Sequence, residues 1–235
     1  MEFYRLLLTI SVLVVFASAK EVKKTTSFYN RDKCGKSMGC WSFPNDCEDQ
    51  ACHTIVRWKT LKNLLRIELQ AKDIENSADK GRYMALGFSD DKFMDNDTII
   101  ECVFDAKGKA KAFVSYNDRT NNVQLEDASA KMVKLRQSAK SDGRLLCKID
   151  VNFGKHKKLK EGERDTIISS AKNAQWTLLF AQGLADPKTY EKFIHAYYPH
   201  STDELVEMCD DCDTKYQVVS QTSPHEVRRL RRSTE

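Results

Sequence analysis

The stretch Gly81–Cys102 constrains the fold more than any other part of this 235-residue chain. Tyr83–Phe88 is mostly apolar, with large and small residues in alternation, and Ser89–Asp97 is rich in turn-forming Asp, Asn and Ser. Thr98–Phe104 is β-branched and aromatic, which favours a half-buried strand. The stretch therefore predicts a strand, a polar loop and a second strand. The loop carries one apolar pair, Phe93-Met94, and a thioether is an unusual residue to place on a polar loop.

Similar segments recur along the chain. Alternating or apolar runs separated by turn residues occupy 54–58, 64–70, 110–117, 123–125, 144–153 and 175–181. A further strand and loop are expected in 131–140, and the basic segment 154–164 is expected to be a loop. Alternation with a period of two buries one face of each strand and leaves the other face in water. About eight short strands with few helical patterns predict an all-β fold, an antiparallel β-sandwich.

The first nineteen residues have the pattern of a cleaved secretory signal. Arg5 supplies a basic residue, residues 6–16 are an apolar run, and Ala17-Ser18-Ala19 is a small-residue cleavage site. No later stretch approaches the roughly 18 consecutive apolar residues of a transmembrane helix. We therefore expect a secreted, extracellular protein without a membrane span. Residues 20–33 are expected to be a flexible leader, and residues 201–235 to hold a Cys-x-x-Cys segment and a basic disordered tail.

Charge and motifs exclude several classes of function. The chain has a net charge of +4, and its last ten residues hold four Arg against two Glu, so the body is nearly neutral. A near-neutral body does not indicate a nucleic-acid surface. The sequence has no Gly-x-Ser-x-Gly, no His-Glu-x-x-His and no phosphate loop. No enzyme is therefore predicted, although a redox carrier stays open.

Eight cysteines in a chain bound for an oxidising compartment predict disulfides rather than catalytic thiols. The first four crowd into nineteen residues and predict two local bridges, with a tetrahedral zinc site as the alternative. The fifth and sixth lie in apolar strands and predict an inter-strand or inter-sheet bridge. The last two flank two Asp, which disfavours a reactive thiolate and indicates a structural role. The cysteines are Cys34, Cys40, Cys47, Cys52, Cys102, Cys147, Cys209 and Cys212.

Several motifs of this sequence together resemble a known domain family. Gly87-Phe-Ser-Asp-Asp-x-x-Met94, an Asn-rich acidic turn and a strand that reaches Glu101-Cys102 together resemble the DOMON domain. Asp142-Gly-Arg-Leu-Leu-Cys147 and Trp176–Gly183 are similar to later strands of that family. The lead-in from Lys36 to Cys40, with Pro44, Cys47, Cys52 and Trp58, is similar to that of ferric-chelate-reductase-like DOMON proteins. The resemblance covers roughly Cys34 to Pro199.

The resemblance implies an immunoglobulin-like β-sandwich over 53–200, joined to a disulfide-rich lead-in over 34–58. Some members of the family bind haem b for electron transfer, and others are thought to bind sugars. Larger relatives are fused to a cytochrome-b561-type membrane unit or to a copper monooxygenase, and this sequence carries neither. Two functions follow as expectations. The first is a secreted haem b protein that passes electrons to a redox partner, and the second is an extracellular module that binds a carbohydrate or a protein.

Three residues are the candidate haem ligands. In haem-binding members iron is held by a Met and a His, and Met94 falls on the signature loop where that Met is expected. His195 is the preferred partner because the apolar residues around it could wall a haem pocket, namely Phe193, Ile194, Tyr197 and Tyr198. His200 follows a proline and is expected to be exposed. The alternative is that Met94 only fills a gap in the packing. Asn96-Asp-Thr is a glycosylation sequon two residues from Met94, so a glycan there would have to point away from any ligand.

Overall fold

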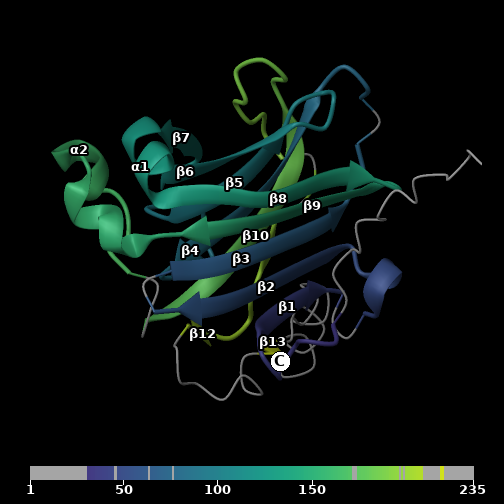
Figure 1. Cartoon of the computed structure of the whole chain (residues 1–235), viewed down its shortest axis with the longest axis horizontal. Helices are drawn as coiled ribbons and strands as arrows, with labels where there is room; N and C mark the ends of the chain where they lie inside the picture. The colour runs from purple at the N-terminus through teal and green to yellow at the C-terminus, as the bar shows by residue number, and fades with distance from the viewer. Residues whose placement is uncertain are drawn as a thin grey trace, which may run out of the picture.

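Two antiparallel β-sheets lie face to face in the computed structural model (Figure 1). The structure describes residues 31–44, 47–62, 64–75, 77–170, 174–195, 197, 199–208 and 218–219. The longer strands of both sheets fall on segments that the sequence marks as strands, so the prediction of an all-β, antiparallel sandwich is confirmed. The strands at 39–43, 200–201, 206–207 and 218–219 were not predicted. The predicted signal at 1–19 and the cysteines at 209 and 212 lie outside the described residues.

The first sheet has the strand order β13-β1-β2-β3-β9-β8 and faces the viewer in Figure 1. Its pairs are antiparallel except for β13 with β1, which is parallel. The strands are β1 (Gly39–Phe43), β2 (Thr54–Leu61), β3 (Leu64–Lys72), β8 (Val133–Ser141), β9 (Arg144–Val151) and β13 (Val218–Val219).

The second sheet has the order β11-β10-β4-β5-β6-β7, and β12 also pairs with β10. Its strands are β4 (Gly81–Ser89), β5 (Thr98–Phe104), β6 (Ala110–Asp118), β7 (Asn121–Leu125), β10 (Gln175–Ala185), β11 (His200–Ser201) and β12 (Val206–Glu207). Every residue of β4 and of β5 is buried, because the first sheet covers one face and a chain segment after β10 covers part of the other. The signature stretch therefore forms the centre of the molecule.

The main core fills the space between the sheets. Its largest fully buried side chains come from both sheets and alternate along the strands, as a half-buried strand requires. They include Trp58, Leu65, Ile67, Leu69, Met84, Leu86, Phe88, Ile100, Phe104 and Phe180. Cys102 of β5 and Cys147 of β9 form a disulfide within this core, so one covalent bond joins the two sheets.

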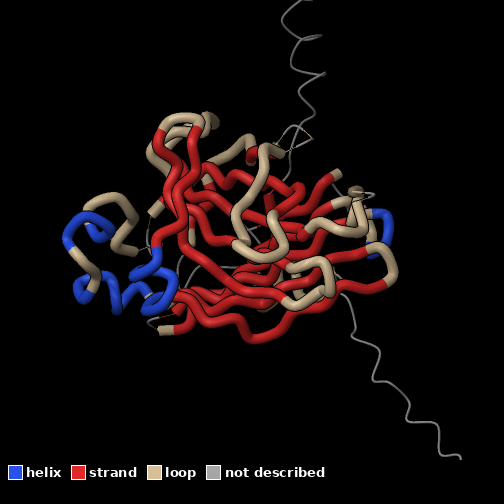
Figure 2. Tube along the Cα trace, turned by 90° about the horizontal axis from the view of Figure 1, so that it is seen from above, coloured by secondary structure: helices blue, strands red, loops and turns tan. Residues whose placement is uncertain are grey.

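The helices of the described residues are short and lie outside the sheets: η1 (Asp49–Ala51), α1 (Glu126–Met132), η2 (Phe153–Lys158) and α2 (Glu161–Arg164). Figure 2 shows most of the helical residues gathered at one end of the sandwich. The sequence prediction was wrong here, since 131–132 end a helix and 154–164 is mostly helical rather than a loop. A tertiary contact explains the difference, because the Glu163 carboxylate accepts hydrogen bonds from the N–H groups of Asp127 (3.1 Å) and Ala128 (2.7 Å). The N-terminus of α1 is thus capped by a residue far away in the sequence, and the local sequence pattern cannot indicate such a cap.

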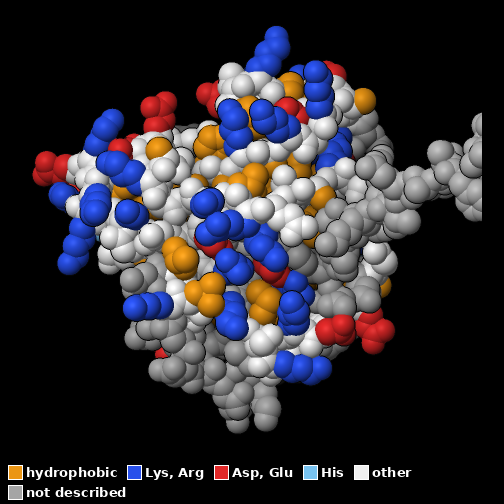
Figure 3. Space-filling model, in the orientation of Figure 1, with side chains coloured by type: hydrophobic (Ala, Val, Ile, Leu, Met, Phe, Trp, Pro, Cys, Tyr) orange, Lys and Arg blue, Asp and Glu red, His pale blue; other side chains and the backbone are white. Residues whose placement is uncertain are grey.

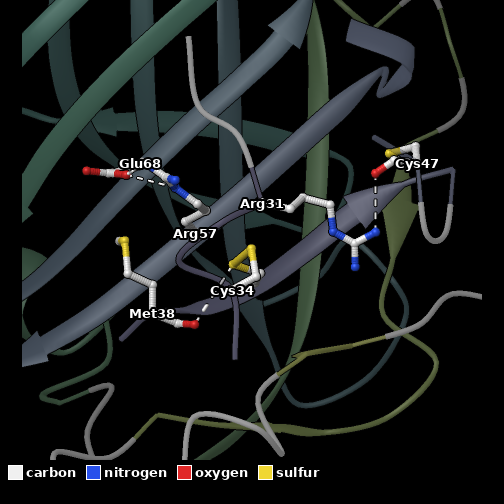
Figure 4. Close-up of a disulfide and its surroundings, with 7 residues drawn as sticks. Arg31, Cys34, Met38, Cys47, Arg57 and Glu68 are labelled. Atoms are coloured by element: carbon white, nitrogen blue, oxygen red, sulfur yellow. Dashed lines mark hydrogen bonds and ion pairs between the residues drawn. A yellow bond between two sulfur atoms is a disulfide. The ribbon is translucent and has the colours of Figure 1, made fainter. Parts of the chain in front are cut away.

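The lead-in is stapled to the edge of the first sheet. Cys34–Cys40 and Cys47–Cys52 are both disulfides, so the two expected local bridges are formed and these sulfurs are not available to zinc. Figure 4 shows the first bridge beside the Arg57–Glu68 ion pair on the outer side of the sheet, with Arg31 turned toward the Cys47 carbonyl. A Cβ on Gly39 would overlap the indole ring of Trp58, so glycine at this position leaves room for the ring to pack over β1.

Candidate functional site

The signature loop between β4 and β5 lies at one end of the second sheet. Short polar side chains hold it in place: Asp91 Oδ1 accepts from the Phe93 N–H (2.7 Å), and Asp95 Oδ1 accepts from the Arg119 N–H (3.0 Å) in the β6–β7 turn. The first bond is typical of an Asx turn, and the second ties the loop to the neighbouring turn. The loop leaves Phe93 74% exposed and Met94 partly exposed. Met94 is therefore accessible from solvent at this end of the sheet.

Asn96 and Asp97 fasten the end of the loop to β6. Asn96 is exposed, has a left-handed backbone (φ 55°) and accepts a hydrogen bond from the Tyr116 hydroxyl at 2.6 Å. Asp97 is 1% exposed and accepts from the Asn117 side-chain amide at 2.9 Å. Burial raises the pKa of Asp97, and the side-chain hydrogen bonds from Ser89 and Asn117 oppose that rise. Glycosylation of Asn96 stays a prediction.

The structure does not bring Met94 and His195 together. The His195 Cα lies 3.3 Å from the point where a Cβ on Gly183 would stand, and Gly183 pairs with Tyr83 near the start of β4. Ser89, at the other end of β4, lies six residues from Tyr83, and Met94 follows it on the signature loop. At the usual rise of a strand, six residues span about 20 Å. The two axial ligands of one haem must both bond to a single iron, and in this arrangement these two residues do not.

His200 lies nearer to the signature loop than His195 does, but its ring contacts the first sheet. It opens β11, pairs with Phe180, and stacks on Phe43 with the ring centroids 3.7 Å apart. The expectation that His200 is exposed was wrong, because its pairing with β10 turns the ring toward β1, where it is partly buried. Burial, and secondarily the nearby His53, lower the pKa of His200 to about 4.

This shift predicts an acid-sensitive fold. Folded His200 stays neutral down to about pH 4, whereas an unfolded histidine takes up a proton near pH 6.5. The unfolded chain therefore binds more protons across this window, and the free energy of unfolding should fall as the pH drops from 6.5 to about 4. One titrating histidine contributes at most one proton, so its share of the slope stays below about 1.4 kcal/mol per pH unit, and the partial exposure of the ring should reduce it further. Urea unfolding at several pH values measures it.

His200→Gln should flatten this slope, and the matched variant His195→Gln should keep it. The His195 imidazole lies on an exposed segment and contacts the Tyr197 carbonyl at 2.9 Å. Equal slopes in the wild type and His200→Gln would contradict the assignment of the acid sensitivity to His200.

A second polar site lies on the outer face of the second sheet, under residues 186–195 and Tyr197, which we call the strap. The strap follows β10 and is the yellow-green loop above the sheets in Figure 1. It crosses back over β4, β5 and β6, where Tyr190 packs in a small cluster with Tyr83, Ile99 and Val103. The strap thus gives the outer face of the second sheet its own hydrophobic core.

A buried ion pair fixes the strap to β5. Glu101 is 0% exposed, and its carboxylate accepts hydrogen bonds from Lys192 Nζ and Ser115 Oγ. The Gln124 side-chain amide donates to Glu101 Oε2 (3.0 Å) and to the Tyr190 carbonyl (3.0 Å), which ties β7 to the same network. Burial lowers the pKa of Lys192, and the charge of Glu101 opposes that shift. Both carboxylate oxygens of Glu101 are therefore satisfied.

Sequence reasoning missed this pair. A usable signal existed, since Glu101 interrupts the apolar strand Thr98–Phe104 at a position that faces away from Cys102 and the main core. A buried carboxylate needs a partner, but nothing local indicates that the partner is Lys192, 91 residues away. Within the described part of the chain, no group of three or more His, Cys, Asp or Glu side chains is placed to hold a metal ion.

These features define a class of protein: a two-sheet β-sandwich with a polar loop at one end of the second sheet and a strap over the outer face of that sheet. The sequence matches the DOMON domain over residues 50–183, more than half of the chain, and the protein therefore belongs to the DOMON domain family. The DOMON domain is generally a ligand-binding module and is typically extracellular. Within the described residues, no helix is long and apolar enough to cross a membrane.

Relatives extend beyond this domain. The chain is 31% identical to the human DOMON domain-containing protein FRRS1L over 87 residues, which is 37% of this chain and 27% of that protein. It is 25% identical over 163 residues to a Drosophila melanogaster protein named for its homology to ferric-chelate reductase 1, with 64% of this chain and 22% of that protein covered. This chain thus spans about a quarter of the length of these relatives.

Proposed function

We propose that this protein is an extracellular, non-enzymatic binding module that docks a protein partner on its strap. The observation that carries the proposal is the exposure of three large apolar side chains there: Phe193 at 44%, Ile194 at 90% and Tyr197 at 53%. The Glu101–Lys192 ion pair anchors the strap beneath them. Exposed apolar residues on a loop held by a rigid scaffold are typical of interaction sites.

The chemistry of the strap favours a protein over a carbohydrate. Sugars stack on open aromatic faces, but the Lys80 ammonium lies 5.6 Å from the ring centroid of Phe193 and occupies one side of that ring. Ile194, the most exposed of the three, has no flat face to offer a sugar. Aliphatic and aromatic side chains together are typical of the apolar centre of a protein–protein interface.

An extracellular location is supported by the disulfides and by the family. Disulfides persist in oxidising compartments and are rare in the cytosol, and this chain forms three among its described residues. The secretory pattern at residues 1–19 agrees with that location.

The haem b hypothesis has weaker support. When bound, haem would supply electron transfer, but the predicted ligands Met94 and His195 do not fit one iron in this arrangement. We therefore expect purified protein, produced with added haem, to show no Soret band. A Soret band that shifts on reduction with dithionite and disappears in Met94→Ala would overturn this expectation.

Binding to individually displayed extracellular domains tests the proposed function. The wild type should bind at least one domain saturably, and Ile194→Asp should weaken that binding at least tenfold, because a charge would be placed in an apolar contact. The matched control Phe93→Asp changes a comparably exposed apolar residue on the signature loop and should bind as the wild type does. Equal loss in both variants, or binding to glycans alone, would contradict the proposal.

A further inference from the structure

The outer face of the first sheet concentrates positive charge. The register of β2, β3, β8 and β9, with the bond of Arg136 to Asp150, places eight basic side chains on this face against two acidic ones. The basic residues are Arg57, Lys59, Arg66, Lys72, Lys134, Arg136, Arg144 and Lys148, and the acidic residues are Glu68 and Asp150. This surplus of six exceeds the net charge of +4 of the whole chain, so the rest of the chain is net negative. Figure 3 shows Lys and Arg gathered across the middle of this face with few Asp or Glu between them.

Each of the two carboxylates is shared between two cations. Glu68 pairs with Arg57 (Nε–Oε2 2.9 Å) and with Lys148 (Nζ–Oε1 2.8 Å). Asp150 accepts two hydrogen bonds from Arg66 (2.7 and 3.0 Å) and one from Arg136 (2.7 Å). Each carboxylate therefore holds its two cations in fixed positions.

The cations are accessible as well as fixed. Lys59 and Lys134 are exposed, and the side chains of Arg66, Arg136 and Lys148 are 35%, 40% and 28% exposed. Lys59 lies opposite Arg66, and Lys134 lies opposite Asp150, so these residues form a row across four neighbouring strands. Four strands span about 14 Å. The arginines of such a row can present guanidinium groups to sulfate or phosphate oxygens.

We propose that the basic side chains of this row (Lys59, Arg66 and Lys134), together with the neighbouring Arg136 and Lys148, bind a sulfated polysaccharide. The sheet face carries no aromatic side chain at the outward positions of the four described strands, so it lacks the stacking groups that single-stranded nucleic acids need. Its centre is charged rather than apolar, unlike the centre of a protein interface. A linear polyanion needs neither an aromatic platform nor an apolar centre, and three disulfides agree with the compartment where such polysaccharides occur.

Binding of the full chain to immobilised heparin tests the site. The wild type should bind at low salt and should not bind desulfated heparin. The double variant Lys59→Gln/Lys134→Gln should bind at least tenfold more weakly, with a shallower dependence on salt because fewer counterions are released. The matched control Lys155→Gln/Lys188→Gln removes the same charge from exposed positions on η2 and the strap and should bind as the wild type does. Equal thermal unfolding of both double variants shows that each is folded.

Two further measurements distinguish this row from the C-terminal segment and from a lipid-binding face. Changing the four arginines at 228, 229, 231 and 232 to Ser should leave heparin binding largely intact, and loss of binding in that variant would assign it to the C-terminal segment instead. Preference for vesicles that contain phosphatidylserine over heparin at the same ionic strength would assign the face to lipid headgroups. No heparin binding at low salt, or equal loss in the two lysine double variants, would also overturn the proposal.

Discussion

Replacing Lys192 with methionine should lower the free energy of unfolding by about 3–5 kcal/mol, because removal of one partner leaves the other charge buried without compensation. Glu101 is 0% exposed and the Lys192 side chain is 10% exposed, so water cannot substitute for the lost ammonium without opening the strap. Ser115 and Gln124 would still donate to Glu101, but neither carries a charge. Chemical denaturation of the purified variant measures the loss.

A double-mutant cycle separates the ion pair from packing. Glu101→Gln alone should also destabilise the fold, since it strands the Lys192 ammonium. The double variant Glu101→Gln/Lys192→Met should recover much of the loss, because no buried charge is then left unpaired. Additive losses in the double variant would show that Lys192 contributes through its aliphatic stem and its position over the Tyr83 ring, 5.6 Å from the centroid.

Loss of the Cys102–Cys147 disulfide should cost about 2–5 kcal/mol of unfolding free energy. The bridge closes a segment with a sequence separation of 45 and joins β5 to β9 across the core, so it restricts the unfolded chain over several strands. The variant Cys102→Ala/Cys147→Val keeps the site apolar and isolates the covalent effect. Unfolding under non-reducing conditions measures it.

The lead-in bridge Cys34–Cys40 supplies the control for this experiment. It closes a segment with a sequence separation of only 6, and its removal should cost less because a shorter loop is constrained. A larger loss for Cys34→Ala/Cys40→Ala than for the core variant would contradict the order expected from loop length.

The sequence predicted the strands because alternation is a local property. The apolar and β-branched residues of Tyr83–Phe88 and Thr98–Phe104 are enough to indicate strands, and these segments form β4 and β5. The helix α1 could not be predicted in the same way, because its seven residues bury only Ala128 and Met132 and its N-terminal N–H groups are capped from Glu163. A helix this short has too few turns for a periodic pattern.

The candidate site was less predictable because it depends on what covers a sheet. Alternation shows that Glu101 faces away from Cys102, but not that Lys192 returns to meet it. Met94 is on the loop where the sequence put it, whereas the position of His195 follows from the path of the strap around Gly183. The net charge of the sequence also gives no sign of the basic face. A total of +4 does not show that the outer face of the first sheet is strongly positive and that the other residues together are negative.

The short strands β11 and β12 have a consequence for solubility. β10 is the longest strand of the sheet, with eleven residues, and among the described strands β4 alone pairs with it along most of its length. β11 and β12 contribute two residues each to its other side, at Leu179–Phe180 and Gln175–Trp176. An uncovered strand of this length would be a template for edge-to-edge association of neighbouring molecules. Proteolytic cleavage after the strap would free that edge, so clipped preparations should aggregate while the intact chain stays dispersed.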